Sequence, residues 1–431
     1  MIEQQPFELS KDFQYVLNLL EKEGKNVFIT GRAGTGKSTL LQLFRQTTRK
    51  KIAVLAPTGV AALNVKGQTI HSFFRFPPKP LSRNEILKRR DRRLYQNLDM
   101  LIIDEISMVR ADLLDQMDYF LRINREKPQP FGGLQMVFFG DLFQLPPVVG
   151  SEAEAMRFQM LYDSPYFFSA HVLQEGFEWE GFELKKVYRQ ENRHFLRLLD
   201  AIRINELDYD DLDDLNRRYL PNFQPTEPHI ILSARNASVD RINRLELEKI
   251  PLEEKSYRAT IKGDFNEALF PTEANLRLKV GAQVMFLKND PDGLFVNGTI
   301  GQVRDLKPEQ VIIQTEQASG KTVDITLEAF EWEIVRYKVS ENDPDAIETE
   351  VIGSFKQLPL KLAWVITIHK SQGKTFDRAI IDLGKGAFEH GQTYVALSRC
   401  RTLEGIVLQQ PIRHQDVLTD ERVIEFYQRW F

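Results

Sequence analysis

The chain has 431 residues, 42% of them hydrophobic and 27% charged, a composition typical of a globular protein with two or three domains. Its apolar runs are too short to span a bilayer, and its formal net charge of −4 excludes a general electrostatic attraction to nucleic acid. A nucleic-acid site would therefore have to be a local groove, and a membrane partner is not expected.

The first half of the chain alternates helical segments with short apolar runs. Residues 11–23 predict an amphipathic helix that ends at Gly24. Buried strands are then predicted at residues 26–30, 51–57, 100–105 and 135–141. Continuous apolar runs of this length, separated by helical segments, indicate a parallel sheet covered on both faces.

A second series of apolar runs follows at residues 229–234, 364–369, 379–383 and 405–410. Between the first and second of these, the sequence changes to short strands with polar turns and no helical periodicity, which indicates an all-β insertion. We therefore expect an α/β protein with two similar domains. The predicted bounds are 1–178 for the first domain, 179–297 and 361–431 for the second, and 298–360 for a small inserted barrel.

Residues 31–38 (GRAGTGKS) match the phosphate-binding pattern G-x-x-x-x-G-K-[ST] in full, between a predicted strand and a predicted helix. The glycines let backbone N–H groups turn inward around a phosphate chain, and the helix N-terminus adds its positive dipole. Lys37 would reach the β- and γ-phosphates, and Ser38 would hold Mg²⁺. The predicted nucleotide-binding residues of this loop are Gly34, Thr35, Gly36, Lys37, Ser38 and Thr39. The alternative is a glycine-rich turn without a ligand.

Two further strand ends carry polar side chains that suit ATP hydrolysis. Asp104 and Glu105 follow the apolar run MLII, where Asp104 would orient Mg²⁺ and Glu105 would activate the attacking water. A kinase needs no such base for water, so the pair favours hydrolysis over phosphoryl transfer. Asp141 and Gln144, in GDLFQLPPV, lie where a γ-phosphate could be sensed; the alternative is a plain strand-to-loop turn.

Six further segments are specific in combination. They are APTGVAA (56–62), TIHSFF (69–74), GDLFQLPPV (140–148), VYRQ (187–190), ITIHKSQGKTFD (366–377) and YVALSRCR (394–401). In this order, with the phosphate loop, they resemble the petite-integration-frequency family of superfamily 1B DNA helicases. The resemblance covers nearly the whole chain, at the length of a bacterial helicase core.

The resemblance implies two RecA-like domains with ATP and Mg²⁺ between them, and a Src-homology-3-like barrel inserted in the second. It also implies a small wedge-like insertion near residues 64–76 of the first domain. The implied activity is ATP-dependent movement along single-stranded DNA from 5′ to 3′, with unwinding of tailed duplexes, forks, G-quadruplexes and RNA–DNA hybrids. A bacterial member would be a monomer in the cytoplasm, associated with the nucleoid. The single cysteine, Cys400, fits such a reducing compartment.

The resemblance also assigns residues to the nucleotide. Arg189 and Arg399 match the arginines that reach the γ-phosphate from the second domain, and Gly373 would let the backbone approach phosphate. The family often reads adenine with a glutamine near the N-terminus. Gln14 lies one residue later than that pattern, and Gln5 is a weaker candidate.

A motor on single strands needs phosphate donors and stacking surfaces. The candidate contacts in the first domain are Pro57, Thr58, His71, Ser72 and Phe73; those in the second are Arg235, Asn236, Thr367, His369 and Lys370. A lone histidine is more often a structural hydrogen-bonding residue, and the basic segment 87–94 is as readily a solvated helix face. Two rival functions stay open: a strand-dependent ATPase that separates no duplex, and a P-loop enzyme that acts on a small molecule.

Overall fold

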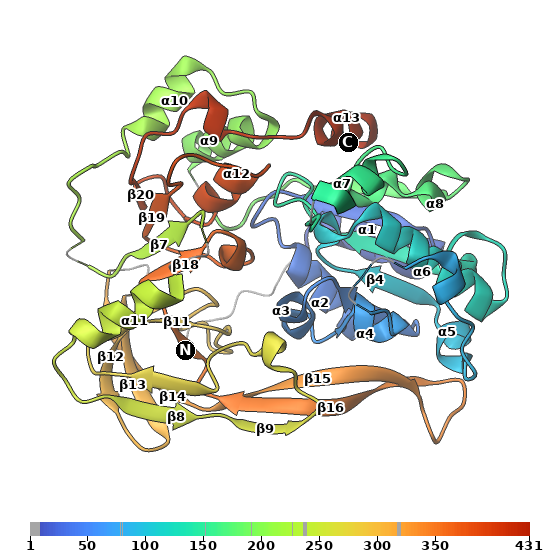
Figure 1. Ribbon diagram of the computed structural model, residues 1–431, viewed down its shortest axis with the longest axis horizontal. Helices are drawn as coiled ribbons and strands as arrows, with labels where there is room; N and C mark the ends of the chain where they lie inside the picture. The colour runs from blue at the N-terminus through green and yellow to red at the C-terminus, as the bar shows by residue number, and fades with distance from the viewer. Residues whose placement is uncertain are drawn as a thin grey trace.

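Two parallel sheets follow one another along the chain, and an antiparallel region is inserted in the second (Figure 1). These are the layers of the computed structural model, which describes residues 9–77, 79, 81–150, 152–190, 192–225, 227–235, 239–316 and 320–431. The predicted α/β class with an all-β insertion is confirmed. Among the described residues, no helix is both long and apolar enough to cross a membrane.

The first sheet contains all four strands predicted in the first half of the chain. Its strands are β1 (Val27–Gly31), β2 (Ile52–Ala56), β3 (Gln68–Thr69), β4 (Met100–Ile103), β5 (Gln135–Phe139) and β6 (Glu180–Leu184), in the spatial order β3-β2-β4-β5-β1-β6. All neighbours are parallel. The helices of this part are α1 (Lys11–Asn18), α2 (Lys37–Thr47), α3 (Gly59–Asn64), α4 (Ile70–Phe74), α5 (Arg93–Asn97), α6 (Ala111–Arg125), α7 (Glu152–Gln159) and α8 (His171–Gln174).

Both faces of this sheet are buried, as the continuous apolar runs predict. Alternate residues such as Val54, Ile102 and Val137 pack in a core with the apolar faces of α1 and α2. Their neighbours, Leu55 and Phe138 among them, pack on the other face with α6. The predicted helix at 11–23 is confirmed, although its last turn is a π-helix (Leu19–Glu23) before the left-handed Gly24.

Two predictions about the first domain are wrong. Strand β6 pairs with β1, so the first domain extends beyond residue 178 to at least Leu184. This edge strand has an alternating, half-buried sequence instead of an apolar run, which hid it. Residues 64–76 form no wedge, because β3 belongs to the main sheet and Phe73, Phe74 and Phe76 are buried in its core.

The second sheet contains the four strands predicted in the second half. They are β7 (Ile230–Ser233), β18 (Val365–Thr367), β19 (Ala379–Asp382) and β20 (Ile406–Leu408), all parallel, in the order β18-β7-β19-β20. The helices α9 (Arg193–Ile204), α10 (Tyr209–Asn216), α11 (Val239–Lys249) and α12 (Gln392–Leu397) accompany it. The two-domain prediction therefore agrees with two separate parallel sheets.

The inserted region is antiparallel and begins earlier than predicted. Its strands are β8 (Lys255–Arg258), β9 (Thr260–Gly263), β10 (Asn275–Leu278), β11 (Gln283–Phe286), β12 (Ile300–Leu306), β13 (Gln310–Glu316), β14 (Thr322–Glu328), β15 (Phe330–Val339), β16 (Ile347–Gln357) and β17 (Leu360–Leu362). The start predicted at residue 298 is therefore wrong, because the exposed strands β8 and β9 carry no apolar run. Five strands form one sheet in the order β14-β13-β12-β11-β17 over a separate hydrophobic core. The Src-homology-3-like topology stays a prediction.

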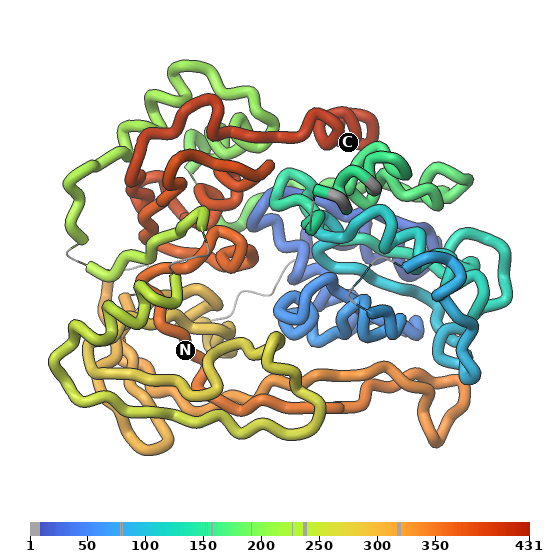
Figure 2. Tube along the Cα trace, in the orientation of Figure 1, coloured from blue at the N-terminus to red at the C-terminus, as the bar shows by residue number. Residues whose placement is uncertain are grey.

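The hairpin β15–β16 leaves the inserted region and runs along one side of the molecule to the first domain (Figures 1 and 2). The Tyr337 hydroxyl accepts a hydrogen bond from the Val54 N–H at 2.9 Å, and the Tyr337 N–H donates to Gln68 Oε1 at 3.3 Å. Nearer the tip, the Asn97 side chain donates to the Pro344 carbonyl at 2.6 Å. The hairpin thus connects the insertion to the edge of the first sheet.

The last helix, α13 (Glu421–Trp430), also crosses to the first domain (Figure 1). Trp430 stacks on Trp179 with ring centroids 4.1 Å apart, and Phe431 meets Phe28 at 5.8 Å. The assignment of residues 361–431 wholly to the second domain is therefore wrong for this helix. Its apolar face is covered by aromatic residues far away in sequence, which no local pattern reveals.

Candidate nucleotide site and strand path

The phosphate loop joins β1 to α2, as the sequence predicts. Gly34 and Gly36 both have a φ of +85°, and a Cβ at Gly34 would lie 2.5 Å from the Cβ of Arg189. Only glycine therefore lets the second domain's arginine approach this closely. The Lys37 ammonium donates to the carbonyls of Gly31 at 2.6 Å and Arg32 at 3.1 Å, so it lies folded within the loop.

The hydroxyl-bearing residues of the loop divide into two kinds. Thr35 is buried, and both its N–H and its hydroxyl donate to the Arg32 carbonyl, at 3.3 and 3.0 Å, so in this structure it closes the loop. Ser38 and Thr39 are exposed at the start of α2. Ser38 is therefore accessible to a cation, and its role as a Mg²⁺ ligand stays a prediction.

The two predicted carboxylates lie side by side at the end of β4. Burial, together with the charge of Glu105, raises the pKa of Asp104 to about 7. Burial also raises the pKa of Glu105, although Lys37 and Arg399 oppose this shift. Glu105 has a φ of +52°, a strained conformation for a glutamate that is typical of functional sites. A divalent cation would relieve the cost of the buried pair, so Asp104 and the Ser38 hydroxyl fit Mg²⁺ chemically.

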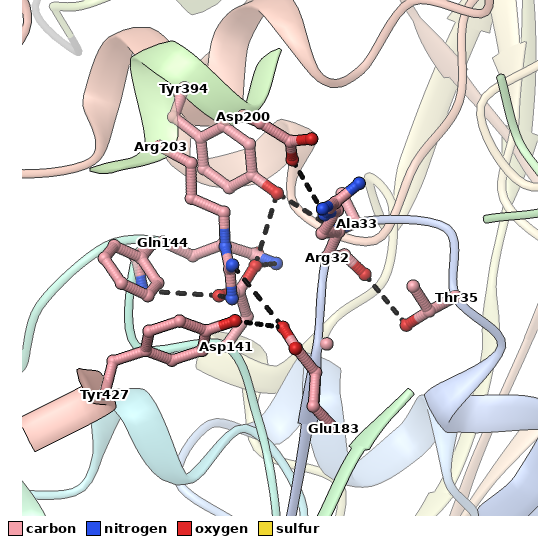
Figure 3. A network of polar contacts seen from close by, with 12 residues as sticks. Arg32, Ala33, Thr35, Asp141, Gln144, Glu183, Asp200, Arg203, Tyr394 and Tyr427 are labelled. Atoms are coloured by element: carbon pink, nitrogen blue, oxygen red, sulfur yellow. Dashed lines mark hydrogen bonds and ion pairs between the residues drawn. The ribbon is translucent and has the colours of Figure 1, made fainter. Parts of the chain in front are cut away.

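Asp141 is the centre of a buried network (Figure 3) and is only 1% exposed. One carboxylate oxygen accepts from the Phe143 N–H and from Arg203 Nη2, each at 3.3 Å. The other accepts from Gln144 Nε2 at 3.2 Å and from the Tyr394 hydroxyl at 3.4 Å. Gln144 is thus held by Asp141, and both of the predicted γ-phosphate residues belong to one arrangement.

Two contacts in Figure 3 join the phosphate loop to the second domain. The Tyr394 hydroxyl, from α12, accepts a hydrogen bond from the Ala33 N–H at 3.2 Å. Arg32 Nε pairs with Asp200 of α9 at 2.7 Å. The phosphate loop therefore lies at the boundary of the two domains, where the resemblance predicts ATP.

The two predicted arginines converge on this site. Arg189 Nη1 donates to the Ser398 carbonyl at 3.2 Å, next to Arg399, which is only 1% exposed. Burial, together with the charge of Arg399, lowers the pKa of Arg189 to about 9. Burial also lowers the pKa of Arg399, whereas Tyr394, Glu105 and Asp141 oppose that shift. An anion bound between the two guanidinium groups would relieve their repulsion.

Sequence reasoning missed two aromatic residues beside the loop. A Cβ at Gly36 would lie 3.2 Å from Phe13 Cζ and 3.7 Å from Tyr188 Cε2, and the Tyr188 ring is half exposed. Tyr188 could have been found, because it lies directly before Arg189 in VYRQ and a half-exposed ring suits a base. Gln14 is next to Phe13 but donates to the Leu9 carbonyl at 3.0 Å, while Gln5 lies outside the described residues. Gly373, with a φ of +73° and open space around it, stays a predicted phosphate contact.

The predicted strand contacts of the first domain line the loops after β2 and β3. Thr58 caps α3 by accepting from the Ala61 N–H at 3.2 Å, directly after Pro57, and the Ser72 hydroxyl accepts from Gln68 Nε2 at 2.8 Å. Burial lowers the pKa of His71 below its usual range. Phe73 is only 3% exposed, so the prediction that it contacts a strand is wrong. Its ring packs edge-on against Phe74 and Tyr95, because apolar helix positions face the core.

The predicted contacts of the second domain lie at the ends of two strands, with Arg235 after β7 and with Thr367, His369 and Lys370 at the end of β18. Thr367 is buried, and its hydroxyl accepts from the Lys370 N–H at 3.1 Å. His369 Nε2 pairs with Glu389 at 2.8 Å, while the side chains of Lys370 and Arg235 are exposed. Asn236 lies outside the described residues.

The basic segment 87–94 is mostly paired within the first domain. Lys88 and Arg92 both contact Glu126, at 2.5 and 2.7 Å, and Arg93 pairs with Asp91 at 2.7 Å. Arg89 donates to the Phe74 carbonyl at 2.9 Å. These contacts favour the alternative in which this segment is a solvated face of the first domain that does not bind nucleic acid.

The inserted region lies over the first-domain strand contacts. A cavity of about 490 Å³ separates residues 59–72 from residues 263–269 and the hairpin. A Cβ at Gly59 would lie 2.0 Å from Leu269 of the short 3-10 helix Glu267–Leu269, so the two parts touch there. The predicted strand path is thus partly covered in this arrangement.

Comparison with known proteins identifies the family. Residues 8–211 match the model of the PIF1-like helicase family, and residues 266–306 match the 2B domain of DNA helicase Pif1. An ATP-dependent DNA helicase Pif1 from Bdellovibrio bacteriovorus is 32% identical over 98% of this chain and 92% of its own length. The chain belongs to the PIF1-like helicase family. It spans 66% of the length of a 35% identical Pif1 helicase from Psychrobacter, a match that covers 90% of this chain.

Solved structures of the family agree with the fold. Unliganded Pif1 from Bacteroides is 38% identical, covers 98% of this chain and 97% of its own, and superposes with a TM-score of 0.89. The complex of Bacteroides Pif1 with ADP-AlF4 superposes on this chain with a TM-score of 0.90. The complex of Bacteroides Pif1 with single-stranded DNA, which is 39% identical, superposes with a TM-score of 0.68. The arrangement of this chain is therefore closer to the first two.

The position of Glu105 generates the first prediction. Glu105→Gln should keep ATP affinity but lower turnover by about 10²–10⁴-fold, because an amide cannot accept the proton of the attacking water. Lys37→Ala is the contrasting variant and should lose ATP affinity as well. Equilibrium binding of ATP and steady-state hydrolysis measure the two effects. Normal turnover in Glu105→Gln would show that another group is the base.

The convergence of the arginines generates the second prediction. Arg399→Ala and Arg189→Ala should each lower turnover by about 10²–10³-fold at nearly constant ATP and strand affinity, because their charges stabilise the transition state. Arg401→Ala is the matched control, since this exposed arginine of the same segment pairs with Asp377 at 2.9 Å. A variant that binds ATP weakly but keeps its maximal rate would instead assign its arginine to the ground state.

Proposed function

We propose that this chain is an ATP-dependent DNA helicase that moves from 5′ to 3′ along single-stranded DNA. The observation that carries the proposal is the nucleotide site itself, where a phosphate loop and a carboxylate pair of one domain face two arginines of the other. A site completed only across a domain boundary links hydrolysis to domain movement. A P-loop enzyme acting on a small molecule needs no such distant arginine pair.

The chemistry follows from the positions of these groups. Ser38 and Asp104 would hold Mg²⁺, whose positive charge would offset the negative charge of the β- and γ-phosphates. The Lys37 ammonium now donates to the carbonyls of Gly31 and Arg32. When a nucleotide binds, its phosphate oxygens would replace these carbonyls as the acceptors. Glu105 accepts a proton from water, and Arg189 and Arg399 stabilise the charge that develops during hydrolysis.

The DNA partners are proposed from the relatives. Structures of Bacteroides Pif1 bound to single-stranded DNA and at forked double-stranded DNA are similar to this chain, with TM-scores of 0.68. We extend the proposal to tailed duplexes, forks, G-quadruplexes and RNA–DNA hybrids, and to a monomer associated with the nucleoid if the source is bacterial. The proposed backbone contacts are Pro57, Thr58, His71, Ser72, Arg235, Thr367, His369 and Lys370.

The covered strand path adds a step to this proposal. Leu269 and the hairpin lie over residues 59–72, and the TM-score falls from 0.89 for unliganded Bacteroides Pif1 to 0.68 for its complex with a strand. The proposed strand therefore enters after the inserted region moves away from the first domain. Such a movement breaks few hydrogen bonds, because in the described part of the chain Tyr337 and Asn97 carry those that join the hairpin to this domain.

The third prediction tests direction and unwinding. The chain should unwind a duplex with a 5′ single-stranded tail and leave 3′-tailed and blunt duplexes intact, because the tail is where both domains first bind. Strand separation is measured with the three substrates at one ATP concentration, with Lys37→Ala as the inactive control. Unwinding from a 3′ tail alone would refute the direction. Strand-stimulated hydrolysis without separation of any duplex would support the rival function, a strand-dependent ATPase.

The fourth prediction concerns the strand contacts. Burial lowers the pKa of His71 and so favours its neutral form, whereas the lysine side chain of Lys370 is exposed. His71→Ala should therefore weaken strand binding at every salt concentration alike. Lys370→Ala should also flatten the salt dependence, by about 0.7 in the slope of log K against log salt.

The matched control is Lys88→Ala, because the Lys88 ammonium is already paired with Glu126. Its strand affinity and salt slope should equal those of the wild type. If His71→Ala and Lys370→Ala also bind the strand like the wild type, the assigned strand path is wrong. The proposal of an ATP-driven motor would not be affected by that result.

A further inference from the structure

One arginine of the second domain is buried among residues of the first. Arg203, near the end of α9, is only 4% exposed. Its guanidinium lies 4.2 Å from the centre of the Phe143 ring and 5.0 Å from that of Tyr427. It also pairs with Asp141 at 3.3 Å and with Glu183 at 3.6 Å. A single side chain thus joins α9, the loop after β5, strand β6 and helix α13.

The Glu183 side of this arrangement is fixed by α13. The Tyr427 hydroxyl donates to Glu183 Oε1 at 2.6 Å, and Figure 3 shows this pair next to the Arg203 guanidinium. Burial lowers the pKa of Arg203, but Asp141, Tyr394 and Tyr427 outweigh it and raise the pKa above its usual range. Arg203 therefore stays charged, and it pairs with two carboxylates, those of Asp141 and Glu183.

The other partner of Arg203, Asp141, contacts residues of the proposed nucleotide site. The Asp141 carboxylate is buried, and Arg203 is the cation paired with it among the described residues. A buried carboxylate without a charged partner is costly and rearranges. Since Asp141 also accepts from Gln144 Nε2 and the Tyr394 hydroxyl, its position sets the positions of both groups.

Tyr394 extends the same chain of contacts to the phosphate loop. Its hydroxyl has one proton to donate, which goes to Asp141, and it accepts the Ala33 N–H. The Tyr394 side chain is 3% exposed, so both hydrogen bonds are shielded from water. A displacement of Asp141 is thereby passed to the backbone of the phosphate loop.

We propose that Arg203 is a positioning residue for ATP hydrolysis, which acts through Asp141 to fix Gln144, Tyr394 and the phosphate loop at the γ-phosphate end of the site. Its proposed role is indirect, with no contact of its own to the nucleotide or to the attacking water. Because it belongs to the second domain, the positioning depends on how α9 sits against the first domain. The inference rests on the ATP hydrolysis proposed above and not on its direction or on unwinding.

The test is the steady-state kinetics of Arg203→Met and Arg203→Lys in the full chain, measured well below the lowest unfolding midpoint. Arg203→Met should lower kcat about tenfold or more, while KM and the affinity for a non-hydrolysable ATP analogue change less than about threefold. Arg203→Lys should recover part of kcat, because lysine keeps the charge beside Asp141 but cannot reach Glu183 with the same planar group.

Arg110→Met is the matched control for a merely structural role. Arg110 also pairs with two carboxylates, Asp112 at 2.8 Å and Glu154 at 2.5 Å, and lies 5.1 Å from the ring centre of Phe158. Its partners are thus of the same kind as those of Arg203, although its side chain is 17% exposed against 4%, and they are not those that hold the phosphate loop. Arg110→Met should lower the unfolding midpoint to a similar extent and keep kcat near the wild-type value.

A double-variant cycle provides the second measurement. Tyr394→Phe removes one oxygen and should also lower kcat at nearly constant KM. If both residues act through Asp141, Arg203→Met with Tyr394→Phe should lose little more than Arg203→Met alone. Should Arg203→Met fail to fold, the cycle is run with Arg203→Lys.

Three results would overturn the inference: a loss of kcat no larger than that of Arg110→Met, a loss confined to KM, or fully additive effects in the double variant. Wild-type turnover and its stimulation by single-stranded DNA, read in the same assay, report on the proposed function. The ratio of variant to wild type reports on Arg203. The two can therefore fail separately.

Discussion

The proposed nucleotide site is made of buried charges that neither domain neutralises alone. The first domain buries the carboxylates of Asp104, Glu105 and Asp141 near the ammonium of Lys37. The second domain brings arginines whose own charges repel one another. Charges in a medium of low dielectric are costly unless they are paired, so each set lowers the cost of the other. Electrostatics therefore favours the domains in contact, and a bound triphosphate with its cation alters that balance.

The topology keeps the two domains close enough for these charges to interact. The chain crosses to the second domain after β6 and returns at its end in α13, whose aromatic residues pack on Phe28 and Trp179. The hairpin β15–β16 makes a further connection on the opposite side of the first sheet, through Tyr337. The aromatic packing of α13 is extensive, whereas the described residues of the hairpin are joined to the first domain by three hydrogen bonds and by the contact of the Tyr337 ring with Phe73, 6.1 Å between centroids. The movement proposed for strand entry is therefore expected at the hairpin and not at the crossing beside Arg203.

Features governed by local rules could be predicted from the sequence. The buried strands and the phosphate loop depend on apolar runs and on glycines with positive φ, and the structure confirms both. Strand β6 and helix α13 depend on partners far away in sequence, so their domain assignments were wrong. The same holds for Phe73, whose burial is decided by Tyr95 and Phe74. Arg203 and Tyr394 carry no motif of their own, because their roles arise only where Asp141 lies between them.

The proposed strand path and the nucleotide site share backbone elements, which gives hydrolysis a route to the strand. In the first domain, the Asp104 N–H donates to the Leu55 carbonyl at 2.9 Å, and β2 leads from Leu55 directly to Thr58. In the second domain, the segment that carries His369 ends at Phe376, whose N–H donates to the Arg399 carbonyl at 2.9 Å. Each domain thus links one proposed catalytic residue to one proposed strand contact through a short stretch of backbone. A movement of Arg399 relative to Asp104 would therefore change the separation of the two proposed strand contacts, as the proposed motor requires in order to step.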